Sequence, residues 1–474
     1  MIQLRLSEIA SAIDATLHGD PDTVVTAGVE TDSRLLTPGS LFVAKPGEHT
    51  DGHKFIPAAM TAGAVAVVVE RYDAELAIDQ LQVTDSVLAL GKLAKYVLET
   101  VRRENGIQVV GITGSNGKTS TKNMLRAMLS EFGATVAPIE SYNNQVGAPI
   151  SVLKIDHKTR FLVAELGAGG RGSIGYLADI IKPDIAVELK VGMAHAGEFG
   201  GIETTAEIKA ELLEHVAESG RVILNADDAL VRQMSDKTVA PISWFGTGAD
   251  ADYRATDIAT SIDGTGFGMH WPDGDTETVR LHIIGEHHVM NALASLAVID
   301  QLGLGRSRAV NALEALPLAE RWRMQLMQRN DGITVINDAY NASPDSTKAA
   351  LQTLAQLGRS GRRTVAVIGE MAELGEFSVH EHDAIGRLVV RLNIDELVVI
   401  GAKAKMVHMG AMQEGSWDGE SKFFDSIAEA FDHLRGMLAA GDIVLVKSSK
   451  SANLRFLGDA LGENSDTLPE EVRA

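Results

Sequence analysis

The amino-acid sequence predicts an α/β protein with three domains. Its 474 residues suffice for about three domains of roughly 150 residues each. Short apolar runs of strand length alternate with helical patterns, as doubly wound, mostly parallel sheets require. The pattern breaks near residue 105 and again near Leu316-Pro317. We therefore expect a small N-terminal α/β domain (1–104), a central domain with a mostly parallel sheet and an antiparallel extension (105–317), and a C-terminal Rossmann-like domain (318–474).

The N-terminal domain contains alternating helix and strand signals. Helices are expected over 7–17, 55–62 and 87–103, and strands over 39–44 and 64–69. The polar segment Thr31-Asp32-Ser33-Arg34 offers hydroxyls and a guanidinium, which suits contact with an anion or a ribose. An ordinary N-cap or turn explains the same residues equally well.

A glycine-rich turn between a strand and a helix is the strongest local signal. The apolar run Gln108 to Ile112 predicts a buried strand, and the segment from Thr121 to Leu129 is expected to begin a helix. Between these two elements lies the turn Gly114-Ser115-Asn116-Gly117-Lys118-Thr119-Ser120. Backbone N–H groups and the helix dipole make such a turn a phosphate site. We expect Lys118 to reach the outer phosphates of a nucleotide and the Thr119 hydroxyl to ligate Mg²⁺.

The spacing of glycines in this turn is a variant. The common nucleotide loop has a glycine five positions before Gly117, where Ile112 stands here. The glycine is one place earlier, at Gly111. A turn without a ligand remains the alternative, although the strand, lysine, threonine and helix in sequence favour phosphate binding.

The remaining elements follow in order. Strands are expected over 160–164, 184–187 and 221–224, an antiparallel meander over 253–284, and a helix from Gly285 to Ala294. The C-terminal domain should contain strands over 333–336, 364–368, 396–400 and 442–446. Its segment 369–375 lacks the glycine spacing of a dinucleotide fingerprint, so NAD binding is not expected.

Composition excludes several classes of protein. The chain has no cysteine, which excludes disulfides and thiolate metal sites. A net charge of −21 argues against binding to nucleic acid backbones. The first residues lack a signal-peptide pattern, and the longest apolar run, 62–69, is too short to span a membrane. We expect a cytoplasmic protein with no integral membrane segment, and a monomer.

Two residues at predicted strand ends could complete a metal site. Glu165 ends the strand over 160–164, beside the phosphate loop if the strands are neighbours, and can meet Mg²⁺. His195 follows the next strand at the same edge. A solvated glutamate and a loop histidine are the alternatives, and spacing alone gives Lys209 no role.

The chain resembles the Mur ligase family, whose members add amino acids to UDP-linked muramic acid. The resemblance rests on the loop Gly111 to Thr119 and on other blocks in the same order. They are Thr31 to Arg34, Leu41 to Phe55, Glu165-Leu166-Gly167, Ala194-His195 with Phe199-Gly200, Lys209, Gly285 to Asn291, Arg323 and Asp338 to Ser346. The last block, Asp-Ala-Tyr-Asn-Ala-Ser-Pro-Asp-Ser, is similar to that of members that add D-alanyl-D-alanine to UDP-N-acetylmuramoyl-tripeptide.

The resemblance implies an ATP-dependent amide ligase of peptidoglycan synthesis with an acyl-phosphate intermediate. It implies two Mg²⁺ ions, with Thr119 and Glu165 on the first and His195 on the second. Lys209 would carry a carbamate formed with CO₂, and Lys118, His195 and Lys209 would be catalytic. The implied ATP contacts are Gly111, Thr113, Gly114 to Ser120, Asn291 for adenine, Arg323 for phosphates, Asp338 for ribose, Tyr340 and Asn341. The implied substrate contacts are Ser33, Arg34, Lys45, Asn143 and Asn144.

Three positions depart from the family pattern. They are His288, where asparagine is usual, Ser173, where glutamate is common, and Glu188, in a stretch that is usually small and polar.

Two alternatives stay open at this point. One is a synthetase of the same family that adds a different amino acid. The other is a nucleotide-dependent regulatory or binding protein without ligase activity. The set of Lys118, Glu165, His195 and Lys209 argues against the second, because a binder needs no second metal.

Overall fold

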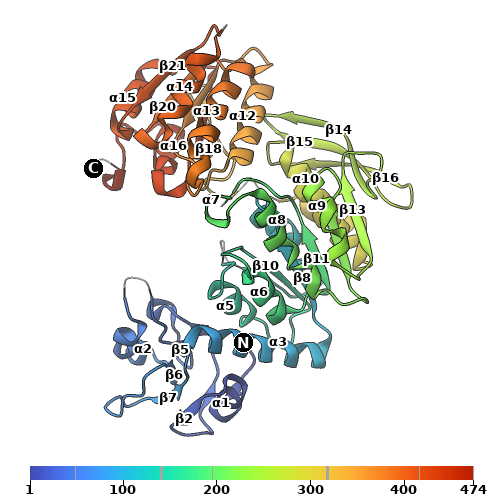
Figure 1. Cartoon of the computed structure of the whole chain (residues 1–474), viewed down its shortest axis with the longest axis vertical. Helices are drawn as coiled ribbons and strands as arrows, with labels where there is room; N and C mark the ends of the chain where they lie inside the picture. Colours follow the sequence, from blue (N-terminus) through green and yellow to red (C-terminus); the bar gives the residue numbers. More distant parts are fainter. Residues whose placement is uncertain (48–49, 139–141, 195, 317–319, 416, 473–474) are drawn as a thin grey trace.

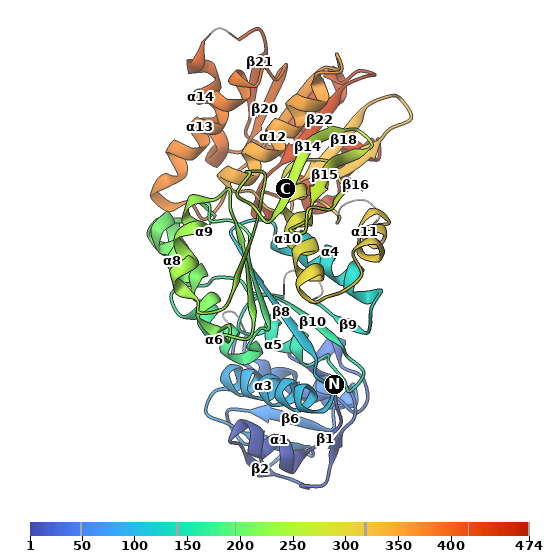
Figure 2. The ribbon, with the colours of Figure 1, turned by 90° about the vertical axis from the view of Figure 1, so that its right-hand side faces the viewer.

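The computed structural model describes residues 1–474 except 48–49, 139–141, 195, 317–319, 416 and 473–474. Three sheet-containing domains follow one another along the long axis, with the N-terminal domain at one end and the C-terminal domain at the other (Figures 1 and 2). The three-domain α/β fold expected from the sequence is confirmed. The boundary expected at 317/318 falls on residues outside the described ones. No described helix is long and apolar enough to cross a membrane.

The N-terminal domain has a five-stranded sheet in the order β2-β7-β6-β5-β4, parallel except for β2. β5 and β6 are buried along their whole length, as strands covered on both faces are. The elements are β1 Leu4–Arg5, α1 Leu6–Ile13, β2 Thr16–His18, β3 Val24–Val25, β4 Val29–Glu30, η1 Ser33–Leu35, β5 Leu41–Val43, η2 Gly52–Phe55, α2 Ile56–Thr61, β6 Ala66–Val69, β7 Asp79–Gln82 and α3 Ser86–Asn105.

The structure differs from the sequence-based prediction at the end of the first helix and at several short strands of this domain. The first helix was expected to reach residue 17, but it ends at Ile13 because Asp14 adopts a left-handed conformation with φ 55°. The chain then turns into β2, which pairs antiparallel with β7. The sequence analysis did not predict β7, because three of its four residues are polar. Gln80 and Leu81 of this strand are nevertheless buried.

The central domain has a nine-stranded sheet in the order β16-β15-β14-β13-β12-β11-β8-β10-β9. The strands from β9 to β14 run parallel, and β14, β15 and β16 form the expected antiparallel meander. The elements are β8 Gln108–Thr113, α4 Lys118–Ser130, β9 Thr135–Val136, α5 Gly147–Val152, β10 Phe161–Glu165, α6 Ser173–Ile181, β11 Ile185–Glu188, α7 Ala196–Phe199, α8 Ile202–Ala210, η3 Leu213–His215, β12 Arg221–Asn225, α9 Ala229–Gln233, η4 Met234–Lys237, β13 Ile242–Gly246, β14 Tyr253–Ser261, β15 Gly264–His270, β16 Thr276–Leu281, α10 His287–Gln301 and α11 Arg306–Glu314.

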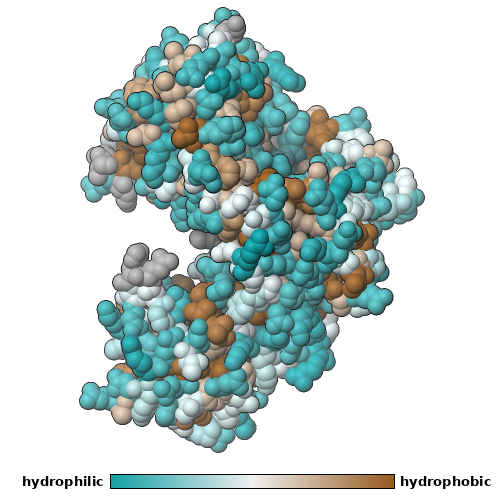
Figure 3. Space-filling view, in the orientation of Figure 1, coloured by the Kyte–Doolittle hydropathy of each residue, from teal (hydrophilic) through white to brown (hydrophobic). Residues whose placement is uncertain are grey.

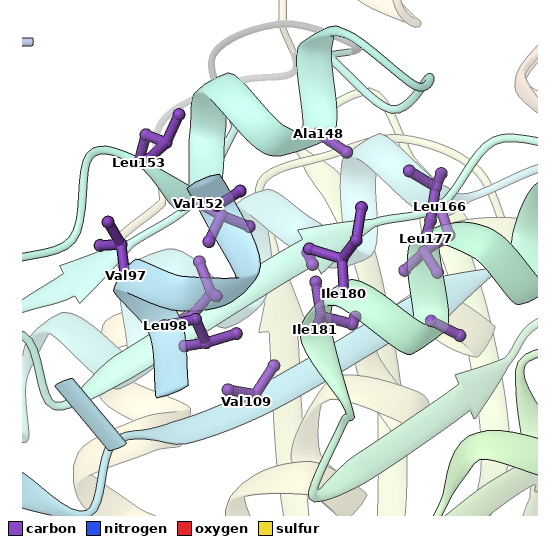
Figure 4. Close-up of a cluster of buried hydrophobic side chains, with 14 of the residues drawn as sticks. Val97, Leu98, Val109, Ala148, Val152, Leu153, Leu166, Leu177, Ile180 and Ile181 are labelled. Atoms are coloured by element: carbon purple, nitrogen blue, oxygen red, sulfur yellow. The ribbon is translucent and has the colours of Figure 1, made fainter. Parts of the chain in front are cut away.

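Helix α3 joins the first two domains into one hydrophobic core. Its side chains Val97 and Leu98 gather with Val109 of β8 and with apolar residues of α5 and α6 (Figure 4). The same cluster extends into the N-terminal sheet. This continuous packing favours a fixed orientation of the N-terminal domain relative to the central domain.

The C-terminal domain has a six-stranded sheet in the order β17-β18-β22-β19-β20-β21, in which only β17 is antiparallel. Its helices cover both faces, as the predicted Rossmann-like pattern requires. The elements are β17 Gln325–Gln328, β18 Thr334–Asp338, α12 Pro344–Gly358, β19 Thr364–Ile368, η5 Gly375–Phe377, α13 Ser378–Arg391, β20 Glu396–Ile400, η6 Ala402–Ala404, α14 Lys405–Glu414, β21 Glu420–Phe424, α15 Ile427–Met437, β22 Ile443–Lys447, η7 Lys450–Ala452, α16 Leu454–Gly462 and η8 Glu470–Val472.

A wide cleft separates the N-terminal domain from the C-terminal domain on one side of the molecule (Figure 3). The two domains lie on opposite sides of this cleft, and the central domain closes its inner end.

Candidate active site

The phosphate loop connects β8 to α4 and is held by the loop that follows β11. The Ser115 N–H donates to the Lys190 carbonyl at 2.7 Å, and the Ser115 hydroxyl accepts the Gly192 N–H at 2.8 Å. Gly117 has φ 87°, and a Cβ atom there would lie 2.3 Å from Oδ1 of Asn291. Glycine is therefore required at 117 both by its backbone conformation and by the close approach of α10.

Lys118 begins α4 and bends back over the loop. Its Nζ donates to the Gly114 carbonyl at 2.6 Å. Burial lowers the pKa of Lys118, while the carboxylates of Glu165 and Glu188 raise it. The lysine thus lies at the N-terminus of a helix, within the electrostatic influence of two acidic groups.

Thr119 and Glu165 meet because β8 and β10 are neighbouring parallel strands. The Thr119 hydroxyl lies 3.2 Å from one Glu165 oxygen and 3.4 Å from the other, and Asn143 donates to the same carboxylate at 2.8 Å. Glu165 is only 1% exposed. A hydroxyl and a carboxylate in contact are the hard oxygen donors that Mg²⁺ prefers, so this pair fits a magnesium ion.

Lys209 and Glu188 lie in the interior beside Lys118. Burial and the Lys118 cation lower the pKa of Lys209, and Glu188 opposes this shift. Burial raises the pKa of Glu188, although Lys209 and Lys118 act in the opposite direction. A buried lysine with a lowered pKa has more of the neutral amine that can react with CO₂, so this residue fits the implied carbamate.

His195 lies outside the described residues, so its relation to this site is not described. Among the residues that are described, no group of three or more His, Asp or Glu side chains is placed to hold a metal. The implied second site therefore depends on His195 and on the modified Lys209.

The phosphate loop faces the C-terminal domain across a cavity of about 340 Å³. The sequence-predicted residues that line it are Ser115, Asn116, Gly117, Lys118, Thr119, Ser120, Asn143, Glu165, Asn291, Arg323, Asp338, Tyr340 and Asn341. These residues come from two domains and span more than 200 positions, yet they share one cavity. A nucleotide bound here would contact both domains.

On the C-terminal side, Asp338 and Arg323 are held in place by neighbours. The Asp338 carboxylate pairs with Lys447 Nζ at 2.6 Å and accepts the Met324 N–H at 2.9 Å. The Arg323 guanidinium stacks on the Tyr340 ring, 4.2 Å from its centroid. An anchored carboxylate suits a ribose hydroxyl, and a stacked guanidinium suits a phosphate.

Sequence reasoning missed Lys447, Lys190, His287 and Asp345, which also line the cavity. Lys447 is the last residue of β22 and pairs in register with Asp338 of β18. Lys447 directly follows the predicted strand 442–446, and this position could have identified it as a residue at the carboxyl end of the sheet. Asp345 accepts the Met193 N–H at 3.0 Å and lies 3.6 Å from Lys190 Nζ. These two contacts join the C-terminal domain to the loop before His195.

Several predicted residues lie away from this cavity. Gly111 lies within β8 and faces Leu212 and Ile181, and the Thr113 hydroxyl donates to the Leu166 carbonyl. Gly114 supplies the carbonyl that Lys118 contacts. Asn144 caps α5 by accepting the Gly147 N–H.

The three N-terminal candidates Ser33, Arg34 and Lys45 belong to a different domain from the cavity. Asp32 accepts the Arg34 N–H at 2.9 Å and pairs with its guanidinium, so this segment has the hydrogen bonding of an ordinary cap. The Arg34 side chain is 84% exposed, which leaves it accessible to a ligand.

The departures at Ser173 and His288 have local explanations. The Ser173 hydroxyl donates to the Gly170 carbonyl and accepts the Gly169 N–H at the start of α6. His288 is buried, and its Nδ1 lies 3.5 Å from Asn291 Nδ2. His288 stacks near His287, with ring centroids 4.1 Å apart.

We predict that His288→Asn makes the protein less sensitive to acid. Burial lowers the pKa of His288 well below 6.5 and that of His287 to about 4, so both stay neutral in the fold. The unfolded chain binds protons below pH 6.5, and each such histidine then costs up to about 1.4 kcal/mol per pH unit. In urea unfolding, the free energy of unfolding should be lower at pH 5 than at pH 7.5. This decrease should be smaller in the variant by up to about 2 kcal/mol. Equal declines in both proteins would contradict this.

Comparisons with known proteins agree with this geometry. Three family models match: "Mur ligase family, catalytic domain" over residues 26–98, "Mur ligase middle domain" over 112–299, and "Mur ligase, glutamate ligase domain" over 322–450. The chain is 40% identical to UDP-N-acetylmuramoyl-tripeptide–D-alanyl-D-alanine ligase of Mycobacterium tuberculosis, covering 97% of this chain and 98% of the relative.

Solved structures give the same result. A crystal structure of MurF from Acinetobacter baumannii matches with a TM-score of 0.89 and 31% identity, covering 97% of this chain and 99% of the other. MurF from Thermotoga maritima in complex with ADP matches with a TM-score of 0.81 and 28% identity, covering 93% and 99%. Since full-length sequence similarity, family models and overall structure agree with the motifs around the phosphate loop, the chain belongs to the Mur ligase family.

Proposed function

We propose that this protein is an ATP-dependent ligase that joins D-alanyl-D-alanine to the terminal carboxylate of UDP-N-acetylmuramoyl-tripeptide. The products are the pentapeptide precursor of peptidoglycan, ADP and phosphate. The observation that carries the proposal is the cavity in which the phosphate loop and Glu165 face Arg323 and Asp338. The relatives with this name cover nearly the whole chain, which supports the same substrates here.

The first step transfers the γ-phosphoryl group of ATP to the tripeptide carboxylate. The bond between the γ-phosphorus and the ADP oxygen breaks, and an acyl phosphate forms. Lys118 and the N–H groups at the start of α4 orient the phosphates and stabilise their charge. Bound Mg²⁺, held by Thr119 and Glu165, would neutralise charge on the transferred group. A second ion would be held by His195 and the Lys209 carbamate.

The second step forms the amide. The free amine of D-alanyl-D-alanine attacks the acyl carbon, a tetrahedral intermediate collapses, and phosphate leaves while the amine loses a proton. Asn291 would hold the adenine, Asp338 the ribose and Arg323 the phosphates. Lys447 keeps the Asp338 carboxylate in place through the 2.6 Å ion pair, and the aromatic contact with Tyr340 restrains Arg323.

We assign the N-terminal domain (1–104) to the UDP-sugar, the central domain (105–317) to ATP, and the C-terminal domain (318–474) to the dipeptide and part of the ATP site. Ser33, Arg34 and Lys45 would contact the UDP-linked substrate, with Asn143 and Asn144 nearer the reacting end. The cleft in Figure 3 separates the outer domains, so reaction would require them to close on the substrates. We also propose a monomer that acts in the cytoplasm.

The decisive measurement is phosphate release from ATP in the presence of UDP-N-acetylmuramoyl-tripeptide, with and without D-alanyl-D-alanine. We expect sustained release only when both substrates are present, together with a product heavier by one dipeptide. Release that ignores the dipeptide would refute the ligase. Release that requires a different amino acid would instead identify a different synthetase of the family.

A further inference from the structure

Glu188 is a buried carboxylate without a hydrogen-bond partner. It is the last residue of β11, its exposed fraction is 0%, and neither of its two oxygens has a hydrogen-bond partner among the described residues. A buried carboxylate in this condition costs several kcal/mol unless something compensates its charge. The two unpaired oxygens of Glu188 therefore indicate that a cation or a hydrogen-bond donor binds beside this side chain.

Three donors on neighbouring segments are used elsewhere. Glu188 pairs in register with Thr113 and Leu224, but the Thr113 hydroxyl donates to the Leu166 carbonyl. The side-chain amide of Asn225 donates to the Leu189 carbonyl, and the Val191 N–H donates to Asp228. These three donors of the described residues are therefore not available to Glu188.

The two nearest cations do not satisfy it either. Lys209 and Lys118 are the main positive charges acting on Glu188, yet neither forms a hydrogen bond with it. Lys118 Nζ donates to the Gly114 carbonyl instead. Glu188 thus faces the catalytic lysines at a longer range than an ion pair requires.

The charge balance of the site explains the need for another cation. The cations of Lys118 and Lys209 balance the carboxylates of Glu165 and Glu188 while Lys209 is protonated. A carbamate on Lys209 replaces one of these cations with an anion. A divalent cation near Lys209 restores the balance, and Glu188 offers it two bare oxygens.

We propose that Glu188 is a ligand of the second Mg²⁺ ion, which it shares with the carbamate on Lys209. This inference rests on the proposed two-metal ligase. It adds a protein oxygen to the site of the second ion, for which the family resemblance had supplied only His195 and Lys209. Mg²⁺ prefers an octahedral set of oxygens, to which a buried carboxylate is well suited.

The test measures binding of Mn²⁺, as a probe for Mg²⁺, by electron paramagnetic resonance with ADP and bicarbonate present. We expect two bound ions in the unmodified protein. Glu188→Gln keeps the side-chain volume but removes the charge, so the Kd of the weaker ion should rise at least tenfold. The tighter ion, at Thr119 and Glu165, should change less than twofold.

Two further variants make the test specific. Glu381→Gln alters a buried glutamate of the C-terminal domain that also has an oxygen without a partner, and both Kd values should stay unchanged. Glu188→Asp retains the charge and should bind the weaker ion more tightly than Glu188→Gln. It also provides a measurement if the glutamine variant does not fold.

The outcomes separate this inference from the function on which it rests. Equal affinities in the unmodified protein and Glu188→Gln would overturn the role of Glu188 and leave the ligase intact. A single bound ion in the unmodified protein would overturn both this role and the two-metal site. Dependence of phosphate release on the dipeptide is measured independently of either result.

Discussion

Replacement of Lys118 by alanine is expected to lower kcat by at least about 100-fold, equivalent to about 3 kcal/mol of transition-state stabilisation. Lys118 is the only lysine in the phosphate loop, and it is partly buried at the start of α4, where the carboxylates of Glu165 and Glu188 act on it. Negative charge on the transferred phosphoryl group is shared among its oxygens in the transition state, where a fixed ammonium group acts most strongly. Initial rates of phosphate release with all three substrates measure the effect.

The matched control is Lys92→Ala, which removes an exposed helix lysine paired with Asp14 in the N-terminal domain. We expect its kcat to stay within twofold of the unmodified protein. Nucleotide binding by calorimetry should show that Lys118→Ala loses less in ATP affinity than in kcat. An unchanged kcat in Lys118→Ala would exclude this loop from the chemistry.

Replacement of Lys209 by alanine should abolish measurable ligation, and added bicarbonate should not restore it. The carbamate requires the lysine nitrogen, which the variant lacks, and without it the second metal loses an oxygen ligand. Lys209 is 3% exposed, and its lowered pKa leaves more neutral amine for reaction with CO₂. The assay is phosphate release and peptide product in buffers with and without bicarbonate.

The unmodified protein provides the complementary measurement for Lys209. Removal of dissolved CO₂ should lower its activity, and bicarbonate should return that activity to the starting value. Native mass spectrometry of the intact protein should detect the added mass of one CO₂, and this added mass should be absent from Lys209→Ala. Full activity in Lys209→Ala would rule out the carbamate.

Local features of the fold were predictable because they depend on neighbours in the sequence. The loop from Gly114 to Thr119 follows a buried strand and begins a helix, and these elements form as expected. Contact between Thr119 and Glu165 was also predictable, since successive parallel strands bring their carboxyl ends to one edge. The length of the first helix was overestimated, because apolar periodicity gives no clear signal for the left-handed conformation of Asp14.

The family, the α/β architecture and the phosphate loop could be predicted from the sequence, because motifs and apolar periodicity are properties of short segments. The tertiary structure alone decided that Lys447 anchors Asp338 and that both face the loop of another domain. It also showed Glu188 to be buried without a hydrogen-bond partner among the described residues, where the sequence showed only an unusual residue. Burial and hydrogen bonding depend on which distant segments pack together, and a strand pattern does not specify those partners.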